Sequence, residues 1–186
     1  RGLAAKNAGR YDEAAKAFDE AASLGERYKD RDEARLLQAK VFELQEKWPE
    51  AEAAYARVAK EIDGRYQGVR AEFDAARVEQ EHGDPKKGDL MMIDAVKRNP
   101  SSGLARHAML RMSGPIEEKE GPDAALAFLA SFEASAAGTD LDEEIAYEEG
   151  LVLFRAGRLE KARDEFLAQA RAHPYPLGTL TDDAYY

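Results

Sequence analysis

Small and large side chains recur along this chain at a fixed spacing of 37 residues. Small residues stand at five equally spaced positions: Ala14, Ala51, Gly88, Ala125 and Ala162. A large apolar residue follows each of them four positions later: Phe18, Tyr55, Met92, Leu129 and Phe166. A spacing of four residues places both side chains on the same face of an α-helix. The pattern therefore predicts five similar helices, each packing a small and a large side chain against a neighbouring helix.

A second helix is predicted ahead of each of these five. Each of these helices carries one more small residue at the same 37-residue spacing: Gly2, Ala39, Ala76, Ser113 and Gly150. Gly9, Gly83 and Gly157 mark the turns that follow, because glycine readily adopts the positive φ that ends a helix. The second repeat has Glu46-Lys47-Trp48-Pro49 at this place. Since it lacks a glycine, we expect its turn to close differently.

Apolar periodicity and turn residues together predict pairs of helices joined by short turns. After a partial helix that ends near Ala8, the expected helices cover residues 11–24, 32–45, 49–62, 67–81, 85–98, 102–112, 122–135, 141–156 and 159–172. Pro115 lacks an amide donor and clashes with the preceding turn, so we expect the helix after Ser102 to kink or end near Ser113. Thr181 is the expected N-cap of a further helix.

The repeat resembles the tetratricopeptide repeat, which has a small residue in its first helix, an Ala and a bulky residue in its second, and a terminal proline. The best copy is Gly150…Gly157-x-Leu159-x-x-Ala162-x-x-x-Phe166…Pro174. The period of 37 exceeds the usual length of about 34. The resemblance implies an all-α fold, a right-handed α–α superhelix of antiparallel helix pairs. It implies a single solenoid over residues 1–186, with repeats at about 1–28, 29–65, 66–101, 102–139 and 140–176 and the start of a sixth pair at 179–186.

Charge and composition narrow the range of partners. The 186 residues include 27 Lys and Arg against 37 Asp and Glu, a formal net charge of −10. The basic residues are scattered among acidic ones, whereas binding to nucleic acid requires them to be clustered. The sequence has no cysteine and no apolar run near the roughly 20 residues of a membrane span. We therefore expect no nucleic-acid partner, no Cys-ligated metal and no direct membrane span in this chain.

Candidate catalytic chemistry is sparse. His82, His107 and His173 lie in different repeats and form no ligand pair at helical spacing. Asp142-Glu143-Glu144 lies early in an expected helix, where acidic residues favour the helix dipole, so we expect these carboxylates on a solvated face. The sequence has neither a Gly-rich phosphate loop nor a nucleophile elbow. We therefore expect a protein that is not an enzyme and has no catalytic residue, metal site or cofactor.

The family resemblance implies that the first helix of each pair lines an inner face that holds a partner segment. On this sequence that face has a column of large apolar residues with charged residues beside it. Its members are Leu36, Lys40, Arg70, Phe73, Arg77, His107, Leu110, Glu144, Tyr147, Leu151 and Phe154. Such a column favours a protein or peptide partner with apolar or amphipathic character. The alternative is that part of the column only seals contacts between adjacent first helices.

Two cellular roles are compatible with this interpretation. The junction His173-Pro174-Tyr175-Pro176-Leu177 and the following Thr181-Asp182-Asp183-Ala184 resemble linkers of bacterial periplasmic tetratricopeptide lipoproteins. That resemblance implies an interaction scaffold in envelope assembly, with a periplasmic or outer-membrane-associated location and the cytoplasm as the next choice. The alternative is a non-catalytic helical arm of a larger enzyme, such as a lytic transglycosylase. Since Arg1 and Tyr186 lie within helical patterns, we expect the chain to continue at both ends.

Overall fold

The structure is a computed structural model that describes residues 1–24, 27–174 and 178–185, with only the backbone described for Tyr28 and Tyr185. The chain divides into two compact units, residues 1–95 and 96–186. Each unit is described by itself below. The described residues form helices and no strand, so the predicted all-α class is confirmed. The Tyr175–Leu177 part of the proline-rich junction lies outside the described residues.

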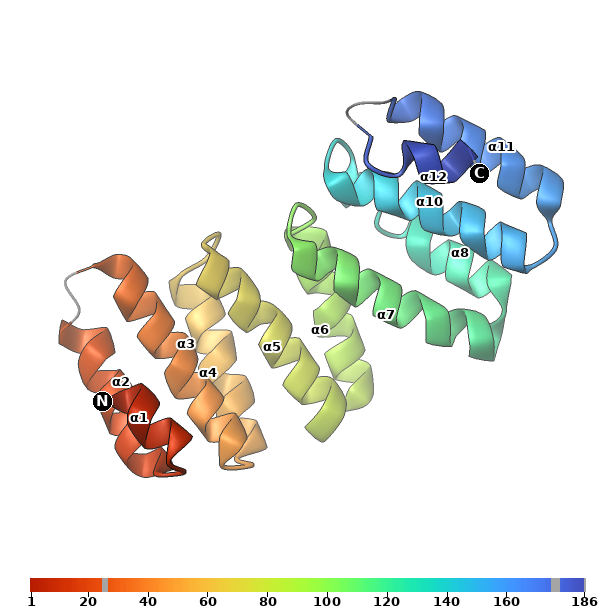
Figure 1. The fold of residues 1–186 in the computed structure, drawn as a ribbon. Helices are drawn as coiled ribbons and strands as arrows, with labels where there is room; N and C mark the ends of the chain where they lie inside the picture. Colours follow the sequence, from red (N-terminus) through yellow and green to blue (C-terminus); the bar gives the residue numbers. More distant parts are fainter. Residues whose placement is uncertain (25–26, 175–177, 186) are drawn as a thin grey trace. The chain divides into compact units, whose positions relative to one another are not determined.

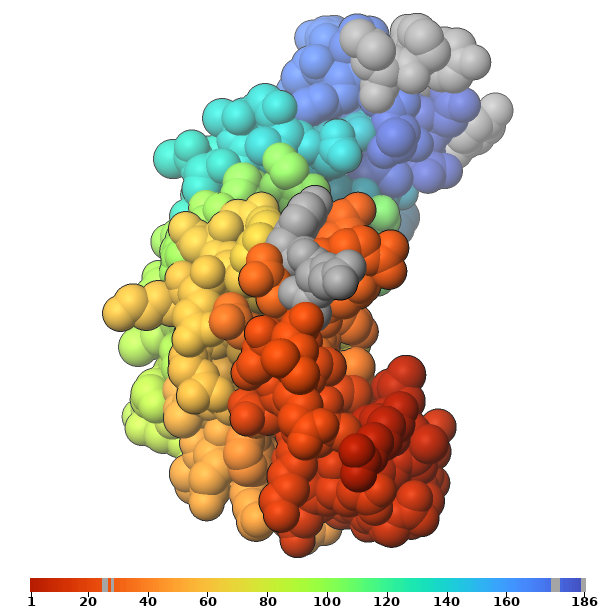
Figure 2. Space-filling model, turned by 90° about the vertical axis from the view of Figure 1, so that its left-hand side faces the viewer, coloured from red at the N-terminus to blue at the C-terminus, as the bar shows by residue number. Residues whose placement is uncertain are grey.

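Helices of the first unit follow one another as antiparallel pairs (Figure 1). They are α1 (Gly2–Asn7), α2 (Tyr11–Leu24), α3 (Tyr28–Leu44), α4 (Trp48–Glu61), α5 (Tyr66–His82) and α6 (Pro85–Arg98), whose last turn enters the second unit. On the face shown in Figure 2, the red, orange and yellow segments of this unit lie side by side in sequence order. Each helix therefore packs mainly against its neighbours in the chain, as expected for stacked repeats.

The second unit continues the pairing (Figure 1). Its helices are α7 (Gly103–Glu120), α8 (Pro122–Ala130), α9 (Glu133–Ala136), α10 (Asp140–Arg155), α11 (Leu159–Ala172) and α12 (Thr181–Tyr185). Sequence periodicity predicts one helix over 122–135, but the structure has a turn at Ser131–Phe132 between α8 and α9. The Phe132 ring is fully buried there.

The small and large residues of the 37-residue pattern form the cores, as predicted. All five small residues of the second helices are buried, and so are all five of the first helices. Gly150 shows why size matters, because a Cβ built on it would lie 2.4 Å from the Phe166 ring. The large residues are buried in the first four repeats, and Phe166 in the fifth is half-buried. The small residue of one helix therefore makes room for the ring of its partner.

Of the two outcomes expected near Ser113, a kink or an end of the helix, the end is wrong. α7 runs without interruption from Gly103 to Glu120 with Pro115 inside it. Pro115 is exposed, so its ring disturbs no core contact, and the buried Ser113 hydroxyl donates to the Leu110 carbonyl at 3.2 Å. Beyond the proline, the Glu117 carboxylate accepts from the Arg155 guanidinium at 2.8 Å. The exposed position of the ring and this contact with α10 thus offset the roughly 3 kcal/mol cost of an interior proline.

The expectation for the turns also needs correction. Glu46 adopts a φ of 58°, close to the 72° of Gly9 and Gly157. The next amide donates to the carbonyl five residues earlier in all three turns, at 2.9 to 3.0 Å. The second repeat therefore closes its turn in the same way without glycine, because these hydrogen bonds offset the strain. Gly83, in contrast, has a φ of −119°, and the Asp84 carboxylate instead accepts from the Lys86 amide at 3.0 Å.

Candidate functional site

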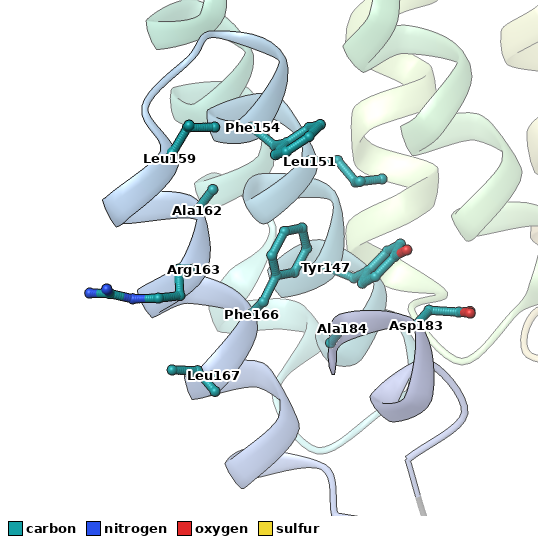
Figure 3. Close-up of a pocket in the computed structure, with 10 residues that line it drawn as sticks. All are labelled: Tyr147, Leu151, Phe154, Leu159, Ala162, Arg163, Phe166, Leu167, Asp183 and Ala184. Atoms are coloured by element: carbon teal, nitrogen blue, oxygen red, sulfur yellow. The ribbon is translucent and has the colours of Figure 1, made fainter. Parts of the chain in front are cut away.

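An open apolar cleft lies between α10, α11 and α12 in the second unit (Figure 3). Its volume is about 530 Å³. Tyr147, Leu151 and Phe154 form its α10 side, and their spacing of four and three residues places them along one face of that helix. All three belong to the inner-face column predicted from the sequence. We call this site the C-terminal cleft.

The other walls come from α11 and α12. Leu159, Ala162, Phe166 and Leu167 contribute the apolar surface of α11, and Asp183 and Ala184 of α12 close one end. The Phe166 ring lies 5.6 Å from the Tyr147 ring, centroid to centroid. Phe154 and Leu159 at the opposite end are 58% and 59% exposed. Complete burial of either side chain against a ligand would contribute about 1.5–3 kcal/mol to the free energy of binding.

The matching place in the first unit lies three repeats, or 111 positions, earlier in the sequence. Lys40, Glu43 and Tyr55 match Leu151, Phe154 and Phe166. The Glu43 carboxylate accepts from Lys40 Nζ at 2.6 Å, from Tyr55 Oη at 2.8 Å and from the Arg77 guanidinium at 2.9 Å. We call these four residues the Glu43 network. This place is therefore occupied by polar side chains, including Arg77 from α5.

The Glu43 network changes the ionisation of its members. Burial acts to raise the pKa of Glu43, but hydrogen bonds from Lys40 and Tyr55 and the positive charges of Arg77 and Lys40 lower it below its usual value. Burial and the adjacent Glu43 carboxylate raise the pKa of Tyr55. The network thus holds a charged carboxylate and a neutral phenol at neutral pH. Lys40 and Arg77, predicted as partner contacts, are engaged here within the chain.

Two other predicted contacts of the first unit are internal. Leu36 and Phe73 are only 4% and 7% exposed, and Leu36 belongs to a core cluster with residues of α4 and α5. These two side chains match the alternative interpretation, in which the column seals contacts between helices. Arg70 is exposed, with its guanidinium 3.8 Å from the Asp74 carboxylate. The first unit therefore offers little open apolar surface at the predicted positions.

The remaining predicted residues of the second unit differ in exposure. Leu110 is half-buried and His107 is exposed. Glu144 is 7% exposed, and its carboxylate pairs with Arg106 at 3.0 Å. Burial raises the pKa of Glu144, partly offset by Arg106. The prediction that this acidic segment forms a solvated face is wrong for Glu144, because the helix turns it towards its neighbour.

Glu143 contradicts the solvated-face prediction more strongly. It is 5% exposed, and its carboxylate accepts from the Leu180 amide at 2.8 Å and from the Thr179 amide and hydroxyl at 3.0 Å. These bonds hold the segment that leads into α12. Thr181 is the first residue of α12 rather than its N-cap, and its hydroxyl donates to the His173 carbonyl. The sequence carried no local signal for this long-range anchor.

The position matching Glu143 in the first unit is Asp32. Asp32 is also buried, and its carboxylate pairs with the Arg65 guanidinium at 3.1 Å, just before α5 begins. Both buried carboxylates therefore anchor the entry to the next first helix. Burial acts to raise the pKa of Glu143, but hydrogen bonds from the Leu180 and Thr179 amides lower it below its usual value.

Glu149 of α10 has its pKa shifted in the opposite direction to that of Glu143. Burial, with Glu165 and Glu133 nearby, raises the pKa of Glu149 to about 7. Burial also raises the pKa of Glu165. The matching first-unit residues are the uncharged Gln38, Ala54 and Ala22. This carboxylate pair at the α10–α11 contact is therefore specific to the second unit.

In the described part of the chain, no group of three or more His, Cys, Asp or Glu side chains is arranged so that it could hold a metal ion. The ring of His82 stacks on Trp48 at 3.5 Å with an angle of 5° between the planes. His173 lies 4.0 Å from the Asp142 carboxylate. Among the described helices, none has the length and apolar character needed to cross a membrane.

Comparison with known proteins agrees with the repeated helix pairs. A tetratricopeptide repeat-like domain model matches residues 43–174, and a tetratricopeptide repeat model matches residues 1–66. A crystal structure of a Podosopora anserina putative kinesin light chain with nearly identical TPR-like repeats is similar over 92% of this chain and 90% of that one, at 13% identity and a TM-score of 0.48. No curated protein matches the chain. The family models span most of the sequence, and the chain belongs to the tetratricopeptide-repeat family.

Proposed function

We propose that this protein is a non-catalytic interaction scaffold and that it binds an apolar or amphipathic segment of a partner protein in the C-terminal cleft. Tetratricopeptide repeats generally mediate binding between proteins. One observation carries the choice of site. Phe154 and Leu159 are more than half exposed beside an open cleft. Exposed apolar surface of this kind marks interaction sites.

A photo-crosslinking amino acid at Phe154 or at Leu159 tests this proposal in the full-length protein in its native cell. Lys60 and Lys161, both exposed and outside the cleft, are the control positions. We expect adducts with another protein from the two cleft positions and none from the controls. Adducts confined to other parts of the same polypeptide would contradict the proposal. That result would favour the alternative of a helical arm of a larger enzyme.

A role in bacterial envelope assembly is a finer part of the proposal. Its support is the resemblance of the sequence around His173–Ala184 to linkers of periplasmic tetratricopeptide lipoproteins. Fractionation of cells that express the tagged full-length protein tests it. We expect the protein in the periplasmic or outer-membrane fraction. Recovery in the cytoplasmic fraction would remove the envelope role and leave the scaffold proposal intact.

A further inference from the structure

We infer that a polar pocket of the first unit binds a phosphate group, held mainly by Arg31 and Arg57. The pocket lies between α2, α3 and α4, in different repeats from the C-terminal cleft. We call it the arginine pocket, after the guanidinium groups of Arg31, Arg35 and Arg57 that line it. The inference does not depend on the proposed function of the C-terminal cleft.

The arginine pocket is large enough for a small molecule. Its volume is about 360 Å³, which lies in the usual range for such sites. The buried side chains of Ala22 in α2 and Val58 in α4 line it together with polar groups from all three helices. A bare phosphate ion would leave room beside it, so the pocket also accommodates a phosphate group carried by a small organic molecule.

Two of the three guanidinium groups lack a counterion within the chain. Arg35 pairs with the Glu61 carboxylate at 3.1 Å. In the part of the chain that the structure describes, neither Arg31 nor Arg57 makes a hydrogen bond or an ion pair. Each guanidinium has five N–H donors in a planar fork, so both are available to a ligand in the pocket.

The charges of the pocket favour an anion. Its three arginines against two carboxylates, Asp19 and Glu61, leave a formal charge of +1. Asp19 accepts from the Gln38 amide at 3.4 Å rather than from an arginine. Because the whole chain has a net charge of −10, this local positive charge runs against the overall composition.

Helix packing does not explain the two free arginines. The residues that match Arg31 and Arg57 in the three later repeats are Gly68, Ala105, Asp142, Asp94, Ser131 and Ala168. None of these residues is basic, so the repeat does not require a positive charge at either position. Two cations without counterions in one pocket repel each other, and a bound anion would offset that repulsion.

The geometry of the donors favours phosphate over carboxylate. Arg31 belongs to α3 and Arg57 to α4, so the two guanidinium groups enter the pocket from different helices. A phosphate group has three strong acceptor oxygens that point in different directions, and it can accept from both guanidinium groups at once. A carboxylate has two oxygens in one plane, which a single arginine already pairs with. The exposed Ser23 hydroxyl of α2 is a further donor at the pocket.

Titration of the 186-residue chain with inorganic phosphate and with O-phosphoserine tests the inference. Potassium chloride keeps the ionic strength constant, and magnetic resonance of the arginine Nε–H groups reports binding. We expect saturable shifts of the Arg31 and Arg57 signals with at least one of the two probes, and binding of acetate about ten-fold weaker. Tighter binding of O-phosphoserine would identify the ligand as a phosphate ester, and tighter binding of inorganic phosphate would identify it as the free ion. Absence of saturation with both probes, or acetate binding as tightly as phosphate, would overturn the inference.

Arginine variants locate the binding. Arg31→Gln and Arg57→Gln each remove charged donors without breaking a contact within the described chain, so each should weaken binding about ten-fold. Arg171→Gln makes the same change of charge at an exposed arginine of α11 outside the pocket, and the affinity should stay within about two-fold. An equal loss in Arg171→Gln would show that only the total charge matters and would contradict the inferred pocket.

Glu61→Gln tests the inference through a gain rather than a loss. It releases the Arg35 guanidinium from its ion pair and removes a negative charge from the pocket. We expect the affinity for phosphate to rise about three-fold. Weaker binding in this variant would contradict the inferred arrangement of charges.

Discussion

The Glu43 network and the C-terminal cleft occupy the same place in repeats that are 111 positions apart, yet they have opposite chemistry. In the first unit, Glu43 binds Lys40, Tyr55 and Arg77, and α5 covers the site. In the second, apolar side chains surround an open space. The residues that set helix packing are kept in both, such as Ala51 and Ala162. The repeat therefore constrains the residues at packing positions, while the side chains between these positions differ in polarity from one repeat to another.

The largest expected effect concerns the Glu43 network. Glu43→Leu leaves Lys40, Arg77 and the buried Tyr55 hydroxyl without their shared acceptor. We expect the free energy of unfolding to fall by about 3 kcal/mol, at the lower end for a broken buried ion pair. Urea denaturation at pH 7, followed by circular dichroism, measures this change.

A combined variant sharpens the same comparison. Lys40→Leu, Glu43→Phe and Tyr55→Phe together give the first unit the side chains of the C-terminal cleft. Because the buried polar groups are removed together, we expect this variant to recover at least half of the loss seen in Glu43→Leu. If it is as unstable as the single variant, the two sites are not interchangeable and the positional comparison fails.

Each unit has one buried carboxylate at matching positions, Asp32 in the first and Glu143 in the second. Substitution of Glu143 tests how much this carboxylate contributes to the stability of the second unit. Glu143→Gln removes the charge that accepts hydrogen bonds from Thr179 and Leu180. We expect a loss of about 2 kcal/mol at pH 7, because hydrogen bonds to charged groups are worth about 1.5–3 kcal/mol. Hydrogen exchange of the Leu180 amide should increase in parallel. Unchanged exchange would show that the carboxylate does not anchor α12.

The pH dependence of Glu143 follows from its lowered pKa. Its stabilising contribution is present above its usual pKa of 4.5 and is lost as the pH falls through the lowered value. The wild-type protein should therefore lose stability below pH 4.5 more steeply than Glu143→Gln. Urea denaturation of both proteins between pH 3 and 5 measures this difference.

Glu149 should give a smaller effect of the opposite sign. Its pKa rises from 4.5 to about 7 in the folded state, so its contribution is fully present below pH 4.5 and is lost as the pH rises to about 7. A pKa shift of this size corresponds to about 3 kcal/mol in the free energy of unfolding. Because Glu149 is partly exposed, solvent screening reduces the expected contribution to about 1–1.5 kcal/mol. Glu149→Gln, which introduces the residue type of Gln38, should flatten the stability profile over this range. An unchanged slope would show that Glu149 does not titrate as described.

The smallest effect on stability is expected for Phe154→Glu. Phe154 is 58% exposed, so its replacement should change the free energy of unfolding by less than about 0.5 kcal/mol. Thermal denaturation checks this. A large loss would show that the ring supports the core, and the cleft would then be a packing feature rather than a binding surface.

The chain order of helices and most of the core could be predicted from the sequence. The recurrence of small and large residues identified Ala14, Tyr55 and Leu129 as core residues, because packing of adjacent helices depends on side-chain volume at fixed spacing. The turns were less predictable. Glu46 adopts a positive φ because of hydrogen bonds to the preceding helix, and the helix continues through Pro115 because distant contacts support it.

The candidate site was predicted only in part. The helical column correctly grouped Tyr147, Leu151 and Phe154 on one face, which the structure brings together in the cleft. The same spacing also includes Leu36 and Phe73, which are buried. The sequence pattern alone therefore could not distinguish the exposed members of the column from the buried ones. Whether a neighbouring helix covers such a residue depends on contacts between repeats.

The repeat, the helix pairs and the side-chain volumes that let helices pack follow from the sequence, since these depend on local spacing. Which carboxylates are buried and which apolar side chains stay exposed depends on contacts between residues far apart in the chain. Glu143 is charged and lies early in a helix, so its sequence favours exposure; only the amides of Thr179 and Leu180, 36 and 37 residues away, make its burial possible. Phe166 has the same place in its repeat as Tyr55, and only the helix packed over it determines whether it belongs to a core or to a cleft.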